Sequence, residues 1–489
     1  MFARVLAAVA AVFLLAGLAS PAEARWIRAE SPRFVIYSDS PEHVARAYAE
    51  KMEMFDSLLR ARHGLPENGV PARKLPIYLL RDHDDLKRTW HTASDTIGGY
   101  YVPGSLDTFA VAPLNGGDDI VVMHEYAHHF MLGSFPGAYP AWMVEGFAEY
   151  YSTTVIDPKF IEVGRVQEWR TGALLADRWI PMADLLANKY DPKRWNEFYS
   201  QSWLLTHYLM SDPQRFEQFR AYAALVAKGG DPVSSMTQAT GLTPDALQAA
   251  LKKYKSGGLK ITQYRRPDFG KPPIAVTVLG PSADDLLLER LQLVGHHFKE
   301  ADPNYLALVT RRAAKHPGDR LAVLTLGQAE LELGDLGRAR AVLEPWIKAN
   351  PQDAEARFVL ATHLNNLADR EEDRTKAQAL RDEARGLMEP AIAAAPGDYR
   401  ILYAYVESRR AEGGYPDKPT LDILIRAYKQ APQVTPVRME LVRALMIRRH
   451  WREARALLGP VVNNPHGGEA AEHGRKLLEQ INEAESRGG

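Results

Sequence analysis

The sequence predicts an α+β fold: a small mixed sheet within a largely helical domain, followed by an α-helical solenoid of repeated helix pairs. Three observations support this prediction. Segments rich in β-branched and aromatic residues occur before residue 113. Helical periodicity dominates from about residue 118 to residue 254. Beyond residue 281, Pro recurs after successive helix pairs.

Residues 1–24 have the pattern of a secretory signal peptide. Arg4 precedes an almost wholly apolar run over residues 5–18, and Ala22-Glu23-Ala24 is a small-x-small cleavage site. The apolar run is short for a membrane span, which needs about 20 residues. We therefore expect cleavage after Ala24, a periplasmic or secreted protein, and no stable membrane span after cleavage.

The composition narrows the class of protein. The 489 residues contain no Cys, which excludes disulfides, a thiol nucleophile and Cys-ligated metals. The formal net charge is -1, so the overall charge gives no reason to expect nucleic acid as a partner. A chain of this length predicts about two to four domains.

Local patterns predict the elements of the N-terminal region. β-Forming residues predict strands over 31–38 and 75–80, and Gly98-Gly99 predicts a turn into a third extended segment. An apolar stripe predicts a helix over 41–62. A further short strand is expected over 107–113. A small mixed sheet therefore precedes the next helix.

The segment over 118–131 combines a helical pattern with the motif His-Glu-Tyr-Ala-His at 124–128. On a helix, His124 and His128 are one turn apart, so both imidazoles project from one face and can hold one metal ion. Glu125 lies beside them and can act as a general base towards a water molecule at the metal.

A second helix is expected from Ala141, because Gly133 and Pro140 end the first one. It carries Glu145 and Glu149, which are four residues apart and share a helix face. A catalytic zinc ion needs three protein ligands and an open fourth position, and two His with one Glu is a known hydrolytic set. Glu145 is therefore the expected third ligand of Zn2+.

These segments resemble the gluzincin metallopeptidases. The resemblance rests on the motif at 124–128 and on Trp-Met-Val-Glu-Gly-Phe-Ala-Glu-Tyr at 142–150. It implies that Glu145 is the third zinc ligand and that Glu149 orients the first His from outside the ligand set. It also implies that the strand over 107–113 is an edge strand that pairs with a peptide substrate. Residues 25–254 would then form a gluzincin-like zinc peptidase domain.

The same resemblance implies a Tyr or His that stabilises the oxyanion. The helical pattern over 195–208 starts with a Tyr-x-x-Ser segment that is similar to the corresponding segment of bacterial peptidase MA-like domains. Tyr199 is the first candidate for this catalytic role. Tyr208 and His207 remain alternatives, and Tyr199 could also be an ordinary core residue beside Phe198.

The composition changes after the helical domain. Residues 255–280 are rich in Gly, Pro and charged residues, which predicts a linker. Residues 281–489 then show repeated helix pairs, with an insertion around 369–376. We expect about four repeats, of which one is regular and the others are irregular.

The clearest repeat covers residues 320–353. Leu326-Gly327 lies in its first helix, Ala339 in its second, and Pro351 at its end. These offsets are those of a tetratricopeptide repeat, in which small residues allow close helix packing. Such repeats form a concave surface for peptides or partner proteins, and some only brace an attached enzyme. The sequence leaves both roles open.

Together these features predict an exported zinc metallopeptidase, most consistent with an endopeptidase. His124, His128 and Glu145 would hold Zn2+, with Glu125 and Tyr199 as catalytic residues and Glu149 in support. The expected partners are a peptide or protein substrate and a protein on the repeats.

Two other functions are compatible with the same residues. One is a catalytically inactive periplasmic interaction or scaffold protein with a peptidase-like module. The other is zinc-dependent hydrolysis of a bond that is not a peptide bond. Substrate identity and oligomeric state are not predicted.

Overall fold

The computed structural model describes residues 26–94, 97–114, 119–166, 168–175, 178–265, 270–295, 303–464 and 467–488. The signal-peptide prediction for residues 1–24 lies outside these residues. The strands are β1 (Ile27–Glu30), β2 (Phe34–Ser38), β3 (Leu75–Leu80), β4 (Tyr100–Pro103), β5 (Thr108–Pro113), β6 (Val155–Ile156), β7 (Phe160–Val163), β8 (Thr262–Arg265) and β9 (Ala275–Val278).

The helices fall into two groups along the chain. Those before β8 are α2 (Glu42–His63), α3 (His83–Thr89), α4 (Ile120–Ser134), α5 (Ala141–Ser152), α6 (Glu168–Leu175), α7 (Met182–Leu186), η2 (Pro192–Arg194), α8 (Trp195–Met210), α9 (Pro213–Ala227), α10 (Pro232–Thr240) and α11 (Pro244–Ser256). Those after β9 are α12 (Ser282–Val294), α13 (Pro303–Ala313), α14 (Arg320–Leu333), α15 (Leu336–Ala349), α16 (Ala354–Arg370), α17 (Arg374–Ala394), α18 (Tyr399–Ser408), α19 (Lys418–Gln430), α20 (Thr435–Ile447), α21 (Trp451–Val462) and α22 (Gly468–Gly488).

The main sheet is mixed and has the strand order β4-β5-β3-β2-β1-β9. β2, β3 and β5 run parallel, while β1, β4 and β9 pair antiparallel with their neighbours. The apolar face of α2 packs on this sheet, with Met52 and Phe55 fully buried against Phe34 and Ile36. Strands β2, β3 and β5 and helix α2 lie in the segments where the sequence predicts them.

The sequence prediction that the strand over 107–113 forms an edge of the sheet is wrong. β5 lies inside the sheet, between β4 and β3, and β4 forms the edge. Sheet order depends on which distant segments pair, and a local pattern of β-forming residues carries no information on that order. In the sheet formed by the described residues, β4 therefore has a strand partner on one side alone.

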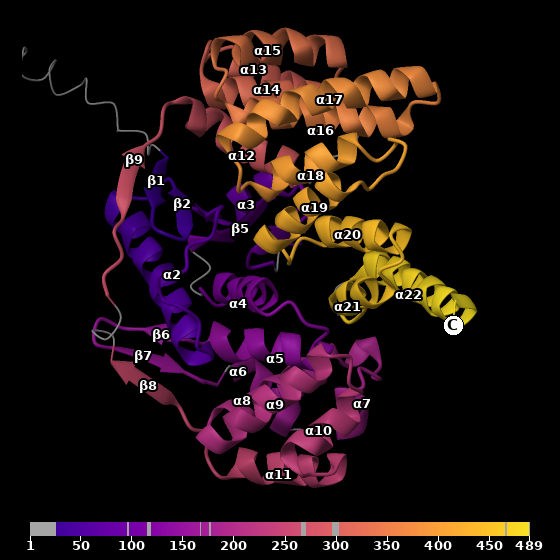
Figure 1. Ribbon diagram of the computed structural model, residues 1–489. Helices are drawn as coiled ribbons and strands as arrows, with labels where there is room; N and C mark the ends of the chain where they lie inside the picture. Colours follow the sequence, from indigo (N-terminus) through magenta and orange to yellow (C-terminus); the bar gives the residue numbers. More distant parts are fainter. Residues whose placement is uncertain are drawn as a thin grey trace, which may run out of the picture.

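Strands β8 and β9 lie within residues 255–280, the stretch for which the sequence predicts a linker. β8 pairs with β7 in a small antiparallel sheet, and β9 pairs with β1 in the main sheet. The Pro- and Gly-rich residues between them separate two strands that join different sheets. β8 and β9 therefore lie along the side of the N-terminal fold (Figure 1).

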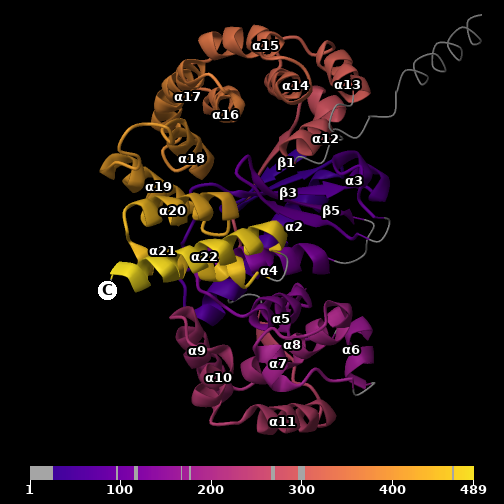
Figure 2. The same ribbon diagram turned by 90° about the vertical axis from the view of Figure 1, so that its right-hand side faces the viewer.

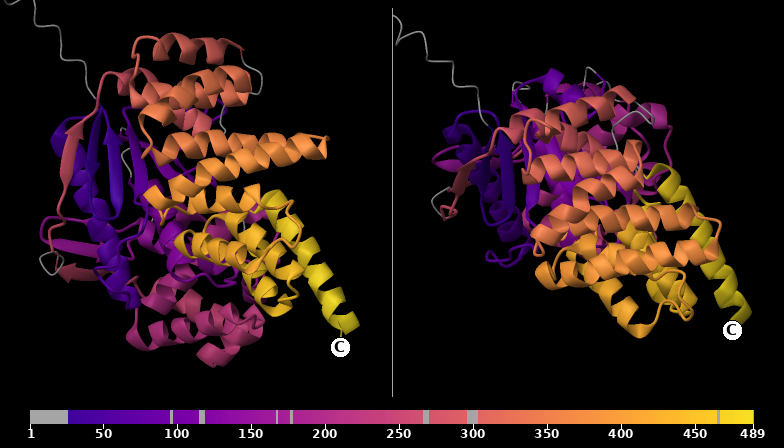
Figure 3. Two further views of the ribbon diagram at one scale, coloured as in Figure 1. Left: turned by 45° about the horizontal axis from the view of Figure 1, so that its top comes forward. Right: turned by 90° about the horizontal axis from the view of Figure 1, so that it is seen from above.

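Helices α12–α22, which we call the repeat region, stack as successive pairs. Figure 3 shows these orange and yellow helices lying side by side along one flank of the N-terminal fold. Gly327 of α14 faces α15 so closely that an added Cβ would lie 2.6 Å from the Leu343 side chain. Ala339 of α15 is fully buried. The two small residues therefore allow the close packing that the repeat pattern predicts.

The repeat region curves from the sheet down to the level of α4 and α5 (Figure 1, Figure 2). α6–α11 form the lower part of the molecule in both views. Within the part of the chain that the structure describes, no helix combines the length and apolar composition that a membrane span requires.

Candidate metal centre

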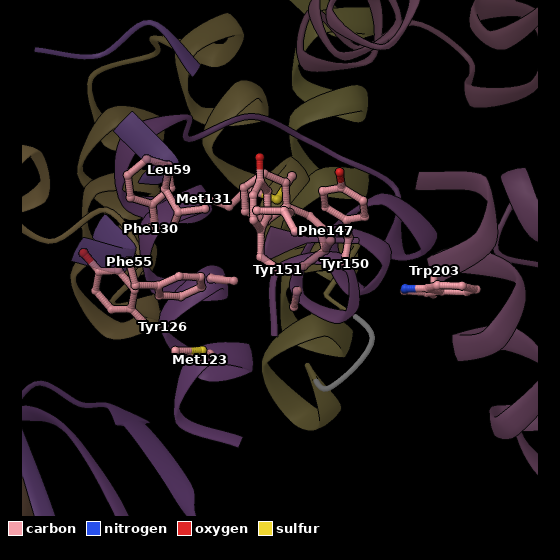
Figure 4. Packing of buried hydrophobic residues seen from close by; sticks show 14 of the residues in the cluster. Phe55, Leu59, Met123, Tyr126, Phe130, Met131, Phe147, Tyr150, Tyr151 and Trp203 are labelled. Atoms are coloured by element: carbon pink, nitrogen blue, oxygen red, sulfur yellow. The ribbon is translucent and has the colours of Figure 1, made fainter. Parts of the chain in front are cut away.

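α4 is positioned by buried side chains that lie away from its His124 and His128. Met123, Tyr126 and Phe130 of α4 are buried and pack against Phe55 and Leu59 of α2 (Figure 4). Tyr126 also donates a hydrogen bond of 2.6 Å to the buried carboxylate of Asp56 on α2. These contacts fix the face of α4 that lies opposite His124 and His128.

A close helix contact positions α5. A Cβ added to Gly146 would lie 2.3 Å from the Thr206 hydroxyl oxygen and 2.4 Å from the Ser202 carbonyl oxygen of α8. No side chain fits in this space, so glycine permits α5 and α8 to pack with their backbones in near contact. The Gly that follows Glu145 in the sequence thus has a packing role that fixes the helix carrying Glu145.

The three predicted metal ligands lie together at this helix pair. The Nε2 atoms of His124 and His128 are 3.0 Å apart. Oε2 of Glu145 lies 3.6 Å from Nε2 of His124 and 3.5 Å from Nε2 of His128. Among the described residues, this is the one group of three His, Asp or Glu side chains with a suitable metal-binding geometry.

The donor triangle can be tested against a tetrahedral zinc site. With bonds of about 2.0–2.2 Å, neighbouring ligand atoms of a tetrahedral zinc ion lie about 3.3–3.6 Å apart. The distances of 3.0, 3.5 and 3.6 Å differ from this range by a few tenths of an ångström at most. Two imidazole nitrogens and one carboxylate oxygen are also donors that zinc prefers. The residues present therefore fit a zinc ion.

Burial strengthens the case for a cation at this position. Glu145 has no measurable solvent exposure. An ionised carboxylate in such a place is costly unless a positive charge compensates it. Protonated His124 or a metal ion would supply that charge.

Glu149 lies next to His124. Its Oε1 atom is 3.6 Å from Nδ1 of His124, on the side of the ring away from Glu145. Burial alone lowers the pKa of His124, but the carboxylates of Glu145, Glu125 and Glu149 outweigh it and raise the pKa to about 9. A proton and a metal ion would therefore compete for His124.

His129 adjoins the motif but belongs to a different environment. Its Nδ1 atom shares a hydrogen bond of 2.8 Å with the Tyr101 hydroxyl of β4. Its ring stacks on Tyr126, and burial lowers its pKa to about 4. His129 therefore links the metal helix to the edge strand as a neutral imidazole.

The three oxyanion candidates all lie on α8, and none is among the described residues that line the metal cleft. His207 is buried, and its two nitrogens bond the Gly164 carbonyl at 3.0 Å and the Tyr254 hydroxyl at 2.8 Å. Tyr208 has the Arg215 guanidinium over its ring, 4.1 Å from the centroid. Tyr199 is half-buried against Trp195 and Phe198. The catalytic role of Tyr199 stays a prediction.

Sequence analysis did not single out Tyr190, which precedes η2. Its ring stacks on Phe198 with centroids 4.3 Å apart. Partial burial and the Glu145 carboxylate raise the pKa of its hydroxyl, so that hydroxyl lies within electrostatic range of the metal donors. Tyr190 sits in an irregular segment without a motif, and only its neighbours in space draw attention to it.

The metal donors open into a cleft of about 640 Å3. One side carries Glu125, His128 and Glu145 together with the edge strand β4. Apolar side chains surround these residues: Trp90, Ile97, Tyr100, Val102, Leu132, Tyr139 and Val144. The other side belongs to the repeat region and carries polar groups: Gln433, Thr435, Arg438, Asn463 and Asn464.

We expect replacement of Glu145 by Ala to remove most of the bound metal, because two imidazoles alone make an incomplete zinc site. Elemental analysis of the purified protein should find about one zinc ion per chain before the change and clearly less after it. Glu217 of α9, an exposed carboxylate, provides the control, and Glu217→Ala should keep its zinc. Equal zinc in both variants would contradict the ligand assignment.

Comparison with known proteins identifies one part of the C-terminal region. Residues 319–363 match the family model described as tetratricopeptide repeat. The chain thus contains a tetratricopeptide repeat, as the sequence pattern predicts. Four solved chains are similar, among them a thermophilic TPR protein of Thermus thermophilus with 17% identity, covering 40% of this chain and 98% of that chain at a TM-score of 0.35. No curated protein matches.

Proposed function

We propose that this protein is a zinc-dependent peptidase that hydrolyses peptide bonds within unfolded polypeptides. The observation that supports this function best is the convergence of His124, His128 and Glu145 beside Glu125 at one open cleft. Three donors with a fourth position facing a cleft are typical of catalytic zinc sites, whereas structural sites use four protein ligands. A zinc ion held here would polarise the substrate carbonyl and lower the pKa of a water molecule.

Glu125 is the proposed general base. It is half-buried, lines the cleft and raises the pKa of His124, so its carboxylate is close to the donor atoms without being one of them. It would take a proton from the attacking water molecule and later deliver that proton to the leaving amine nitrogen. Glu125 is thereby returned to its ionised form.

The edge strand β4 is the proposed main-chain binding site. β4 lines the cleft, and an extended peptide could add to its outer edge by main-chain hydrogen bonds. This places the pairing one strand further out than the sequence prediction of residues 107–113. Tyr199 stays the candidate that the resemblance implies for stabilising the oxyanion. We add Tyr190, because partial burial and the Glu145 carboxylate raise the pKa of its hydroxyl.

A non-catalytic interaction protein is the second candidate function. The tetratricopeptide repeat at residues 319–363 favours it, because such repeats generally bind proteins. Under either function we propose export, on the basis of the cleavage pattern at Ala22-Glu23-Ala24. The two functions differ in whether the cleft catalyses a reaction.

The function is tested by incubating the zinc-loaded protein with fluorescently labelled β-casein, an unstructured polypeptide. We expect fragments to accumulate, the reaction to stop after metal removal with 1,10-phenanthroline, and activity to return when zinc is added. Mass spectrometry of the fragments distinguishes internal cleavage from trimming of the ends. A protein with about one zinc ion per chain and no hydrolysis would instead favour the interaction protein.

A further inference from the structure

We propose that the repeat region is a wall of the substrate site, so that the site takes an extended polypeptide segment with a large apolar side chain near the cleaved bond. This inference rests on the proposed peptidase function and specifies its substrate class. It assigns the repeat region a direct role in substrate binding. Contacts at three places support it.

The first contact holds the turn between β4 and β5. The Tyr399 hydroxyl of α18 donates a hydrogen bond to the Gly104 carbonyl at 2.7 Å and lies 2.8 Å from the Thr108 hydroxyl. Arg400 donates to the Leu106 carbonyl at 3.1 Å. The Leu106 side chain packs against the apolar core of the repeats. The inner surface of the repeat region is thus occupied here by the chain's own edge hairpin.

The second contact lies in the loop between α4 and α5, whose Gly137 and Tyr139 line the cleft. The Asn463 side chain, just after α21, donates a hydrogen bond of 3.1 Å to the Ala138 carbonyl. A Cβ added to Gly459 would lie 2.2 Å from the Ala138 Cβ, so α21 meets this loop without a gap. The repeat region is therefore attached both to the edge hairpin and to the loop that joins the two metal helices.

The third contact runs towards the metal helix. Gln433, between α19 and α20, lines the cleft together with Tyr101 of β4, and its Oε1 atom would lie 3.8 Å from a Cβ added to Gly133 of α4. The Tyr101 hydroxyl shares a hydrogen bond with Nδ1 of His129, the residue that follows His128. The repeat region, the edge strand and the metal helix thus meet at the cleft itself.

The two sides of the cleft suit different parts of a peptide. The apolar side, with Trp90, Tyr100 and Tyr139, suits a large apolar side chain. The repeat side offers hydroxyl and amide groups at Thr435 and Asn464, which suit main-chain carbonyl and amide groups. The free edge of β4 runs between them. A substrate in such a space is extended, because a folded surface would meet both walls before it reached the metal donors.

Thr435 is the position at which to test this inference. It is half-buried at the start of α20, and it belongs to the cleft lining but to none of the three contacts. Thr435→Trp would narrow the cleft from the repeat side, and Thr435→Arg would do so with a charged side chain. Ile447, exposed at the far end of the same helix, provides the control Ile447→Trp.

Binding is measured in the Glu125→Gln background, so that the result does not depend on turnover. Fluorescence anisotropy of labelled β-casein should show binding that Thr435→Trp and Thr435→Arg weaken about tenfold, while Ile447→Trp leaves it unchanged. Zinc content should be the same in all variants. Circular dichroism identifies a variant that has failed to fold. If one Thr435 variant fails to fold, the binding measured for the other tests the inference.

The outcomes separate this inference from the proposed function. Unchanged β-casein binding in a folded Thr435 variant would overturn the wall assignment, and so would a complete lack of binding before Thr435 is changed. If the wild-type protein binds β-casein without hydrolysing it, the proposed function fails, while the Thr435 comparison still decides the role of the repeat region. Cleavage sites without large apolar residues would refute the predicted side-chain preference.

Discussion

Glu125→Gln is expected to lower peptide hydrolysis by about 10²–10⁴-fold while the zinc content stays the same. Gln has the shape of Glu but cannot accept and return a proton at neutral pH, so general-base catalysis is lost. The donor atoms of His124, His128 and Glu145 lie 3.0–3.6 Å apart, and Glu125 is not one of the donor residues. The Glu125→Gln variant should therefore bind zinc normally and lose most of its hydrolytic activity.

The experiment compares initial rates on labelled β-casein with zinc content by elemental analysis. Glu217→Gln makes the same chemical change at an exposed position of α9 and should keep wild-type turnover. Wild-type-like hydrolysis by Glu125→Gln would refute the base assignment. Loss of zinc from that variant would instead identify Glu125 as a ligand.

The metal motif was predictable because its geometry is local. Residues four apart on a helix face the same way, so His124 and His128 could be paired from spacing alone. Glu145 needed a second helix, and the Gly146 contact with α8 that positions this helix was not visible in the sequence. The motif indicated which residues belong together, and tertiary packing determined how close their atoms come.

Features that depend on distant pairing were not predictable in the same way. β9 joins β1 although about 250 residues separate them, and nothing in its own four residues identifies that partner. The order β4-β5-β3 likewise depends on pairing, so the wrong strand was predicted at the edge. The repeat pattern indicated helix pairs correctly, but it contained no information on where they dock.

Arg400→Met is expected to destabilise the protein by about 3 kcal/mol, since it removes one member of a buried ionic cluster. Arg400 is 2% exposed and lies 2.7 Å from the carboxylates of both Glu355 and Asp398. Arg73 and Arg290 also pair with this cluster, so some compensation remains and the loss should be near the lower end of the usual range. Chemical denaturation measures the change, and Lys418→Met, at a largely exposed ion pair, should leave the midpoint unchanged.

The pH dependence of this loss distinguishes a charge effect from a packing effect. Burial alone would raise the pKa of Glu355 and of Asp398, but Arg400 and the other guanidinium groups outweigh it and hold both values below the usual range. A carboxyl group with a lowered pKa stabilises the fold above its ordinary value, here 4.5 and 3.8, and this contribution is lost as the pH falls through the folded value.

The difference in unfolding free energy between wild type and Arg400→Met should therefore be largest near neutral pH and shrink below about pH 4. A difference that stays constant with pH would mean that Arg400 acts through packing on Phe358, whose ring lies 4.9 Å from the guanidinium carbon. Because Arg400 also holds the Leu106 carbonyl in the edge hairpin, the same variant should bind β-casein more weakly at neutral pH. Weaker binding that follows the same pH profile as stability would connect the ionic cluster to the position of β4 beside the metal donors.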